Sequence, residues 1–471
     1  MDSKPFIKLV KSPFNKYIYD VNTNQVIKIS EELYNYLNNQ SDETPSESVK
    51  DQINFLKKKG YLSDNRAKKI IHSESNRLSY HLEKNITQIT LQVTQQCNFR
   101  CSYCPYTTAE FDNNREHGSK IMSMETAKKA IDFFAEHSIE QDSVCIGFYG
   151  GEPLLSFNLI KEAVDYAEKI FLGKEISFTL TTNGSLLTDD VLNFISKHNF
   201  HFMISLDGPP ETHNRSRKFA ASGKGTFSFI EKNLKNIIEN YPDLIPMIAI
   251  NVVIDPRYSA NNFHRMFSND CVFSKFQIQS TLIDDFFSIE KVTLGNEYSI
   301  EDGIHMFKAY AAYINRYPKD KVSKVAYNRI MTSFERNKMF MKPEKMLPPE
   351  CAPGGPCVPG QRRLFIDVDG NFFPCERVSE TSEAMKIGNI DRGFDYDQAY
   401  RLLNIGQLTS ERCKNCFAFR HCSICAKLCD NNGELSAELK LSNCRNVKRD
   451  TMRTLEDYIL EKELHEEKKS E

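Results

Sequence analysis

The chain has 471 residues, which is enough for two to three domains of about 100–200 residues each. Apolar residues make up 40% of the sequence, so a sizeable core can form. The formal net charge of −2 gives no electrostatic reason to expect binding to nucleic acid or to an anionic membrane. The sequence shows neither an apolar run of about 18 residues nor a signal-peptide pattern, so we expect a cytoplasmic protein without membrane spans.

The sequence contains 14 cysteines. Without a secretion signal, so many thiols indicate metal binding rather than disulfides, and most of them lie in groups. Cys145 and Cys271 are different, because each sits in or beside an apolar strand-like segment. We expect these two to be ordinary buried thiols.

Residues 1–80 contain no cysteine and form the first predicted domain. Residues 17–29 read as two strands around an Asn-rich turn, and Ser30 is a plausible cap for the helix that follows. This pattern resembles the winged-helix-like element with which peptide-modifying enzymes recognise a leader peptide. The resemblance implies that the leader adds a strand to the sheet edge. A small packing or dimerisation domain is the alternative.

Residues 64–86 are polar and suit a linker, and from residue 85 apolar strands alternate with amphipathic helical stretches. This alternation indicates parallel β/α architecture over residues 85–300, with ligands at the carboxyl ends of the strands. The predicted strands cover residues 89–93, 143–149, 176–181, 202–206, 247–254 and 273–279. The predicted helices between them include 124–136, 159–170, 189–197 and 227–240.

Three thiols follow the first of these strands, in the pattern Cys97-x3-Cys101-x2-Cys104. Three thiolates at this spacing can hold three irons of a four-iron cluster. Cys145 is badly placed to hold the fourth iron, so that iron is left open for a small chelating molecule. A zinc site or three unrelated thiols are the alternatives, although structural zinc usually takes four protein ligands.

This loop, with Tyr103 just before the last cysteine, resembles the cluster loop of radical S-adenosylmethionine (SAM) enzymes. The resemblance implies an α/β fold built on a partial (β/α)6 barrel. It also implies that SAM binds the open iron of the [4Fe–4S] cluster and is cleaved to a 5′-deoxyadenosyl radical. A small electron donor such as flavodoxin or ferredoxin would then be a partner.

Further motifs follow the predicted strands. Gly150-Gly151-Glu152-Pro153 is similar to the family's GGEP motif, which contacts the SAM amino group, while Thr182-Asn183-Gly184 is either a turn or a ligand-side element. By resemblance, Ser205 would bond the SAM ribose and Arg217 would reach the SAM carboxylate, with Arg215 as its competitor. Tyr103 would contact the adenine or serve as a core aromatic residue. We expect His213 to be structural.

The remaining cysteines gather in residues 346–450, beyond a helical bridge at residues 301–345. Their spacing resembles the SPASM extension of radical SAM peptide-modifying enzymes, which carries two auxiliary [4Fe–4S] clusters, and structural zinc is the alternative. The resemblance assigns one cluster to Cys351, Cys357, Cys375 and a later thiol, and the other to Cys413, Cys416, Cys422 and Cys444.

The usual position of the later thiol is Ala426 in this chain. Cys425 lies one residue early and Cys429 three residues late, so we favour Cys425, which needs the smaller loop change. Glu376 stands where sulfatase-maturing relatives carry an aspartate as a proton acceptor. Residues 451–471 read as a charged, solvated helical tail.

Together these features predict a radical SAM maturase that forms Cys thioether bridges in a ribosomally made precursor peptide, of the sactipeptide or ranthipeptide type. It would use SAM and three [4Fe–4S] clusters. One alternative is an anaerobic sulfatase-maturing enzyme that makes formylglycine. The other is a non-catalytic iron–sulfur or zinc protein that carries electrons or acts as a scaffold.

Overall fold

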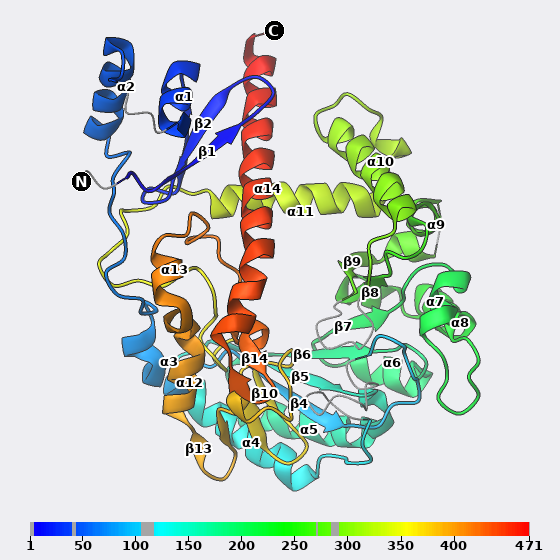
Figure 1. Cartoon of the computed structure of the whole chain (residues 1–471). Coiled ribbons are helices and arrows are strands. Elements are labelled where there is room, and N and C mark those ends of the chain that lie inside the picture. The colour runs from blue at the N-terminus through cyan, green and yellow to red at the C-terminus, as the bar shows by residue number, and fades with distance from the viewer. Residues whose placement is uncertain (1–3, 40–43, 105–116, 270–271, 284–291, 471) are drawn as a thin grey trace. The chain divides into compact units, whose positions relative to one another are not determined.

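The structure is a computed structural model that describes residues 4–39, 44–104, 117–269, 272–283 and 292–470 (Figure 1). The chain forms two compact units, each described by itself below. The first unit contains Met1–Asn76, Met331–Cys357 and Tyr400–Glu471, and the second contains Arg77–Ile330 and Val358–Ala399. The predicted C-terminal domain, residues 346–450, is therefore divided between the two units.

The second unit is built on a large, mainly parallel sheet. Six of its strands lie side by side in sequence order and run parallel, which confirms the predicted α/β class. They are β4 (Gln88–Thr94), β5 (Ser143–Gly150), β6 (Glu175–Thr182), β7 (Phe200–Ser205), β8 (Ile248–Ile254) and β9 (Gln277–Leu282). Their carboxyl ends consequently meet at one edge of the sheet.

Four further strands extend the sheet beyond β4. The first of them pairs parallel to β4, and the remaining three follow in antiparallel order. They are β10 (Leu364–Ile366), β11 (Asn371–Phe373), β12 (Gly388–Asn389) and β13 (Gly393–Phe394). The sheet thus has ten strands in the described part of this unit.

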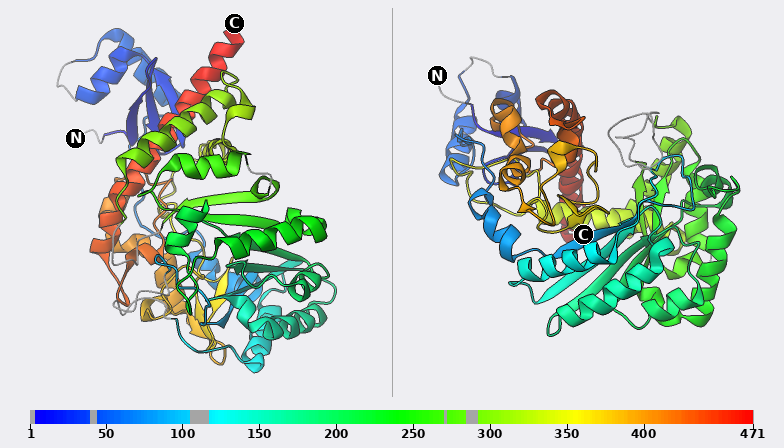
Figure 2. Two further views of the ribbon diagram at one scale, coloured as in Figure 1. Left: turned by 90° about the vertical axis from the view of Figure 1, so that its right-hand side faces the viewer. Right: turned by 90° about the horizontal axis from the view of Figure 1, so that it is seen from below.

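Helices connect the parallel strands. Because the strand order never reverses, right-handed crossovers place all of these helices on one face of the sheet, unlike in a doubly wound sheet. Figures 1 and 2 show the cyan to green helices along the outer side of these strands. The helices of the unit are α3 (Leu78–Lys84), α4 (Met124–His137), α5 (Phe157–Ile170), α6 (Asp189–Ile195), α7 (Pro210–Ser216), α8 (Phe227–Asn240), α9 (Ala260–Asn269) and α10 (Asn296–Tyr313).

The last parallel strand differs from its prediction. The sequence predicts a strand over residues 273–279, but Phe273–Lys275 is a short 3-10 helix and β9 begins only at Gln277. Phe273 is buried, so its apolar side chain packs as part of the connecting turn. The strand itself carries polar residues such as Gln277 and Gln279, which do not give an apolar signal.

The first unit opens with a three-stranded antiparallel sheet and two helices. The predicted pair of strands is present, preceded by an additional strand that the sequence did not reveal. Ser30 caps the first helix as predicted, because its hydroxyl accepts the N–H of Leu33 at 3.1 Å. The elements are β1 (Ile7–Lys11), β2 (Lys16–Asp20), β3 (Gln25–Ile29), α1 (Glu31–Asn39) and α2 (Glu47–Lys58).

Later segments of the chain complete this unit. One apolar core joins the sheet to residues from the far end of the sequence, including Phe419, Leu455 and Ile459. The later elements are α11 (Lys324–Phe340) and α12 (Tyr396–Leu403), which both begin in the second unit, and α13 (Ser410–Lys414), β14 (Asp430–Asn431), β15 (Glu434–Leu435) and α14 (Ala437–Ser470). No helix in the described ranges combines the length and apolar content that a membrane crossing requires.

Two expectations about this unit were wrong. Residues 64–86 are not a simple polar linker, because Ala67 and Ile70 are buried in the same core. The segment predicted as a solvated tail over residues 451–471 is packed in its described part, because α14 buries Leu455 and Ile459 against that core. Even charged residues of this helix, such as Lys440 and Glu461, are buried, so composition alone misrepresents its packing.

Glu463 fastens α14 to the first sheet. It is 6% exposed, and its Oε1 accepts hydrogen bonds from Ser12 Oγ at 2.7 Å, Asn15 Nδ2 at 2.7 Å and Tyr17 Oη at 2.8 Å. Figure 1 shows the red helix beside the blue strands. Burial alone raises the pKa of Glu463, but the three hydrogen bonds outweigh it and lower the pKa.

Replacing this residue in the variant Glu463→Gln is expected to lower the free energy of unfolding by about 2 kcal/mol, since the donors lose a charged acceptor. Folding lowers the pKa of Glu463 below its ordinary value. The stabilisation is therefore complete at a pH above the ordinary pKa and is lost as the pH falls through the lower pKa of the folded protein. Denaturant unfolding at neutral and acidic pH measures both effects. Glu456→Gln, at an exposed position of the same helix, is the control and should change little; equal losses in the two variants would contradict the prediction.

Candidate functional site

The cysteine loop lies at the carboxyl end of β4, as predicted. Residues 98–102 pair with residues 216–220 through backbone hydrogen bonds, among them Arg100 N–H to the Lys218 carbonyl at 2.9 Å and Ser102 N–H to the Ser216 carbonyl at 3.0 Å. The Phe99 and Phe219 rings meet edge to face at 5.1 Å. This pairing brings the segment after α7 against the three thiols.

Cys97, Cys101 and Cys104 lie within electrostatic range of one another. Burial raises the pKa values of Cys97 and Cys101 to about 12, so these thiols need a positive partner, such as iron, to ionise. Among the described residues, no three His, Cys, Asp or Glu side chains gather closely enough for one metal ion. A four-iron cluster gives each thiolate its own iron, and three thiolates are the donor set that leaves one iron open.

The structure describes only one of the two isolated cysteines of this part of the chain, Cys145 and Cys271. Cys145 lies within β5, partly buried, with its Sγ 4.0 Å from Thr179 Oγ1. This position agrees with a thiol outside any cluster. Cys271 falls outside the described residues, so its predicted structural role stays a prediction.

Gly150 and Gly151 permit a close approach of two backbone segments. A Cβ on Gly150, which has a φ of 139°, would lie 2.0 Å from the Thr94 carbonyl oxygen, and one on Gly151 would lie 2.2 Å from that of Gln96. The Glu152 N–H also donates to the Gln96 carbonyl at 2.8 Å. The two glycines therefore let the GGEP turn pack directly on the residues that precede Cys97.

Glu152 connects the GGEP turn to the turn after β6. Its buried carboxylate accepts hydrogen bonds from Thr182 Oγ1 at 2.8 Å and from the N–H groups of Asn183 at 2.7 Å and Leu154 at 3.1 Å. Burial raises the pKa of Glu152 to about 7, although these hydrogen bonds oppose the rise. The carboxylate thus serves the fold of the site, and its contact with the SAM amino group stays a prediction.

Asn183 extends this connection to the cysteine loop. Its Nδ2 donates to Asn98 Oδ1 at 2.8 Å and lies 4.0 Å from Cys97 Sγ, and Asn98 in turn donates to Ser185 Oγ at 2.9 Å. The Thr-Asn-Gly segment is therefore more than a turn, because it holds the first cysteine. The sequence showed the motif but not this contact.

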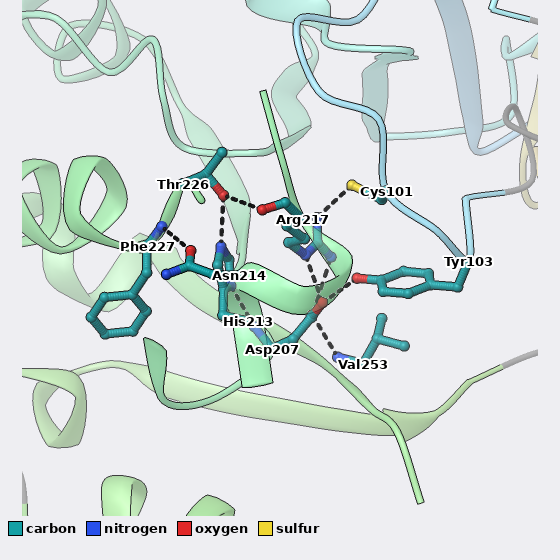
Figure 3. Close-up of polar contacts among 9 residues, drawn as sticks. All are labelled: Cys101, Tyr103, Asp207, His213, Asn214, Arg217, Thr226, Phe227 and Val253. Atoms are coloured by element: carbon teal, nitrogen blue, oxygen red, sulfur yellow. Dashed lines mark hydrogen bonds and ion pairs between the residues drawn. The ribbon is translucent and has the colours of Figure 1, made fainter. Parts of the chain in front are cut away.

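Arg217 and Asp207 form a buried ion pair beside Cys101 (Figure 3). Arg217 Nε donates to Asp207 Oδ2 at 2.8 Å and Nη2 donates to Oδ1 at 3.2 Å, while Nη1 lies 4.0 Å from Cys101 Sγ. The side chains of Arg217 and Asp207 are 8% and 4% exposed. The Tyr103 hydroxyl also donates to Asp207, and its ring lies 5.4 Å from the guanidinium.

The two arginines that the sequence analysis proposed for the SAM carboxylate, Arg215 and Arg217, lie in different environments. Arg215 is exposed and stacks on Tyr258 at 4.5 Å, whereas Arg217 is buried with its Nη1 4.0 Å from Cys101 Sγ. Asp207 is a site residue that sequence reasoning missed. A carboxylate directly after the fourth parallel strand, close to a candidate arginine, was the signal that could have found it.

His213 is structural, as the sequence predicted. The N–H of Asp207 donates to its Nδ1 at 3.2 Å, so that nitrogen carries no proton and Nε2 is the protonated one facing Thr226 Oγ1 at 2.9 Å. The Thr226 hydroxyl donates to the Arg217 carbonyl at 3.1 Å. Burial lowers the pKa of His213 to about 3, so the ring is neutral and supports the backbone of the ion pair.

Ser205 completes the set of predicted SAM contacts. It is the last residue of β7, it is buried, and it lies level with Asn251 on β8. The structure therefore gathers the three cysteines, Tyr103, the GGEP turn, Ser205 and Arg217 at the carboxyl ends of β4 to β7. Their individual roles toward SAM stay predictions.

A second group of thiols lies in the first unit. Cys416 is within electrostatic range of Cys413 and Cys444, and Cys422 is within range of Cys413 and Cys416. Burial raises the pKa of Cys416, Cys422 and Cys444. The four thiols assigned to one auxiliary cluster thus lie in one region of the unit, with Cys429 in the same region. Four thiolates are the full donor set of such a cluster, and this assignment stays a prediction.

A buried lysine accompanies this group. Lys440 is 2% exposed, and its Nζ donates to Thr409 Oγ1 at 2.6 Å and lies 3.5 Å from Cys413 Sγ. It stands one helical turn before Cys444 on α14. The sequence analysis missed this residue, although the i, i+4 spacing to a cysteine was visible.

The choice between Cys425 and Cys429 stays open. Cys429 is buried and lies within electrostatic range of Cys422, Cys425 and Cys444. Cys425 follows Ile424, whose carbonyl lies close to Gly355, between Cys351 and Cys357. Cys375 belongs to the second unit, so its assignment to a cluster with Cys351 and Cys357 remains a prediction.

Comparison with known proteins identifies the domain that holds the first thiol group. Residues 91–268 match the model of the Radical SAM superfamily. The radical SAM cyclopropyl synthase TigE of Paramaledivibacter caminithermalis is 28% identical over 203 residues, which cover 41% of this chain and 42% of that protein. The cysteine-type anaerobic sulfatase-maturating enzyme of Clostridium novyi is 32% identical, over 34% of this chain and 41% of its own. The aligned segments span about two fifths of each of these two relatives.

A longer match exists at lower identity. The cysteine-type anaerobic sulfatase-maturating enzyme of Clostridium perfringens is 23% identical over 367 residues, covering 75% of this chain and 91% of that enzyme. A solved structure of anSMEcpe with bound AdoMet and a peptide matches 78% of this chain and 99% of its own, with a TM-score of 0.53 and 19% identity. That likeness establishes the fold.

Proposed function

We propose that this chain, which carries a radical SAM domain at residues 91–268, is a maturase that forms Cys thioether bridges in a ribosomally made precursor peptide. The observation that carries the proposal is the grouping of Cys97, Cys101 and Cys104 with Arg217 and Glu152 at the carboxyl ends of parallel strands. Three thiolates leave one iron of a [4Fe–4S] cluster for SAM. The family match supports SAM and this cluster as cofactors.

When bound, the cluster and SAM would supply a 5′-deoxyadenosyl radical that takes a hydrogen atom from a peptide carbon. The residues of the chain have separate tasks. The pairing of residues 98–102 with 216–220 fixes the loop, and the Glu152 and Asn183 contacts hold the neighbouring turns. The positive charge of Arg217 lies beside Cys101 and favours the thiolate form of that thiol. The Asp207 carboxylate, which pairs with Arg217, partly opposes this effect.

The second thiol group suits the same activity. With Cys413, Cys416, Cys422 and Cys444 all engaged, an auxiliary cluster there would have no open iron and would carry electrons rather than bind substrate. We propose three [4Fe–4S] clusters in total, with Cys351, Cys357, Cys375 and Cys425 at the remaining one. Lys440 offsets negative charge around the second group.

The leader of the precursor would bind the first sheet. β3 is an outer strand in the sheet order, and β1, the other outer strand, belongs to the hairpin that Glu463 fastens to α14. An extended peptide can pair with an outer strand through backbone hydrogen bonds. We therefore place the leader on β3 and the core peptide at the radical SAM domain.

Leader binding is testable in the intact protein. Deleting residues 1–80 would expose the core that Phe6 and Tyr19 share with Leu455, so binding should be measured with the full chain. We expect the isolated leader to bind about as tightly as the whole precursor and the isolated core peptide far more weakly, by fluorescence anisotropy. Equal binding of leader and core would contradict this assignment.

The activity is tested with Cys-rich peptides encoded beside the gene for this protein. Reduced enzyme, SAM and peptide are incubated without oxygen, and the product is examined by mass spectrometry. Each thioether bridge removes two hydrogen atoms from the peptide, and fragmentation locates it. A peptide that stays unmodified would contradict the proposal, and conversion of a sulfatase-derived peptide to formylglycine would favour the sulfatase-maturing alternative.

A further inference from the structure

The face of the large sheet that carries no crossover helices is hollow. A cavity of about 310 Å³ lies on it, within the second unit. Side chains from alternate positions of six parallel strands line it, including Thr90, Thr179, His201, Gln277 and Gln279. Parallel strands usually carry apolar side chains on both faces, so hydroxyl and amide groups are unusual here. They stand beside apolar residues such as Phe202 and Met203, and this mixture suits a guest with both kinds of group, such as a peptide.

Gly147 lies in the wall of this cavity, where the side chains of neighbouring strands close over it. A Cβ at this position would lie 2.9 Å from Thr179 Oγ1, 3.0 Å from Thr90 Oγ1 and 3.2 Å from Gln88 Nε2. Glycine thus lets these polar side chains approach one another across β5 and line the cavity together.

One end of the cavity carries charge. Arg363 directly precedes β10, whose register pairs Leu364 with Ile89, so Arg363 lies level with Gln88 and lines the cavity with it. Glu376 follows β11, and its Oε1 accepts a hydrogen bond from Arg363 Nη1 at 2.7 Å. These two, His201 and Tyr149 are the ionisable residues among the described residues that line the cavity.

The exposure of the two partners differs. The Arg363 side chain is 48% exposed, whereas that of Glu376 is 13% exposed and also lies 3.8 Å from Arg377 Nε. Glu376 thus already faces two guanidinium groups. Arg363 has five N–H donors in a planar fork, which leaves it able to hold a second carboxylate.

We propose that this cavity binds the core peptide through an acidic side chain, whose carboxylate is held by Arg363. The inference rests on the proposed function as a peptide-modifying enzyme and names the chemical class of its substrate. A basic side chain fits less well, since it would meet the exposed Arg363 before the covered Glu376.

The length of the cavity limits the position of the acidic residue. The lining begins at Gln88 on β4 and reaches Tyr149 on β5, which pairs with Gln92 of β4. These two levels are four residues apart, so the cavity is about 13 Å long at about 3.3 Å per residue. The end of the cavity opposite Arg363 adjoins the candidate site, because its lining residue Thr181 directly precedes Thr182, which donates a hydrogen bond to Glu152. An extended peptide covers this distance in about four residues, so the acidic side chain lies about four residues from the modified carbon.

Binding of short peptides to the iron-loaded protein tests the inference without turnover. The probes are hexapeptides capped at both ends that differ at one position, which is Asp, Asn or Lys. Calorimetry should show the Asp peptide binding about tenfold more tightly than the Asn peptide, because the hydrogen bonds to Arg363 are charge-assisted. The Lys peptide should bind more weakly than either.

Variants connect this preference to one residue. Arg363→Gln should remove the preference for Asp, Arg363→Lys should keep part of it, and Arg362→Gln, at the exposed neighbouring position, should keep all of it. Equal binding of the Asp and Asn peptides, tighter binding of the Lys peptide, or a preference that survives Arg363→Gln would overturn the inference. Those results would leave the maturase function standing, whereas an Asp preference without any thioether product would refute only the function.

Discussion

The variant Cys101→Ala is expected to lose about four irons per chain and to form no 5′-deoxyadenosine from SAM above background. Cys101 lies at the centre of the site, within electrostatic range of Cys97 and Cys104 and 4.0 Å from the Arg217 guanidinium. Two remaining thiolates cannot hold a cluster that needs three protein ligands. Iron and sulfide analysis, together with chromatography of the reaction products, measures both effects.

Cys145→Ala is the matched control for this experiment. Its thiol is also partly buried in the second unit, but it lies within β5 beside Thr179. This variant should keep its iron content and its SAM cleavage. If Cys101→Ala behaved like Cys145→Ala, the three-thiol loop would not hold the cluster that acts on SAM.

The variant Asp207→Asn is expected to lower the free energy of unfolding by about 3–5 kcal/mol, because Arg217 would keep its charge in a buried position without a partner. The change also weakens the acceptor for Tyr103 and for the Val253 N–H, which donates to Asp207 Oδ1 at 3.1 Å. Denaturant unfolding of the intact protein measures the loss.

Two further variants test the cause of this loss. The double variant Asp207→Asn with Arg217→Gln should recover part of the stability, since no unpaired charge remains. Asp369→Asn removes one partner of the exposed Lys120–Asp369 pair and should cost about 1 kcal/mol or less. A double variant that is less stable than Asp207→Asn would contradict the ion-pair explanation.

The sequence predicted most of the parallel strands of the large sheet because apolar side chains recur along them, but it did not reveal the short strands β10 to β13. The expected strand over residues 143–149, for example, differs from β5 (Ser143–Gly150) by one residue. β9 was misplaced, because Gln277 and Gln279 line the cavity and leave no apolar pattern. The feature that hid this strand also supports the substrate inference.

The packing of α14 could not be predicted from local pattern. Leu455 and Ile459 lie one helical turn apart in a highly charged segment, and the core they share includes residues as distant in sequence as Phe6 and Met341. Glu463 looked like one more surface charge until its three donors from the first hairpin were known. Contacts between distant parts of the sequence override composition in this case.

Spacing predicted the thiols of the candidate site, but not the residues that hold them in place. The three cysteines of the loop and Arg217 came from motifs, whereas Asp207 and Asn183 gained their roles only through the meeting of separate loops. The same limit applies to Lys440, which a helix brings to Cys413. Residues that position a ligand lack the regular spacing of the ligands themselves.

The most direct test of the central claim is the reaction of the reduced, iron-loaded protein with SAM in the absence of oxygen. If Cys97, Cys101 and Cys104 hold a cluster with one open iron, 5′-deoxyadenosine and methionine will form in equal amounts. Recovery of intact SAM from protein that carries its full iron content would contradict the account.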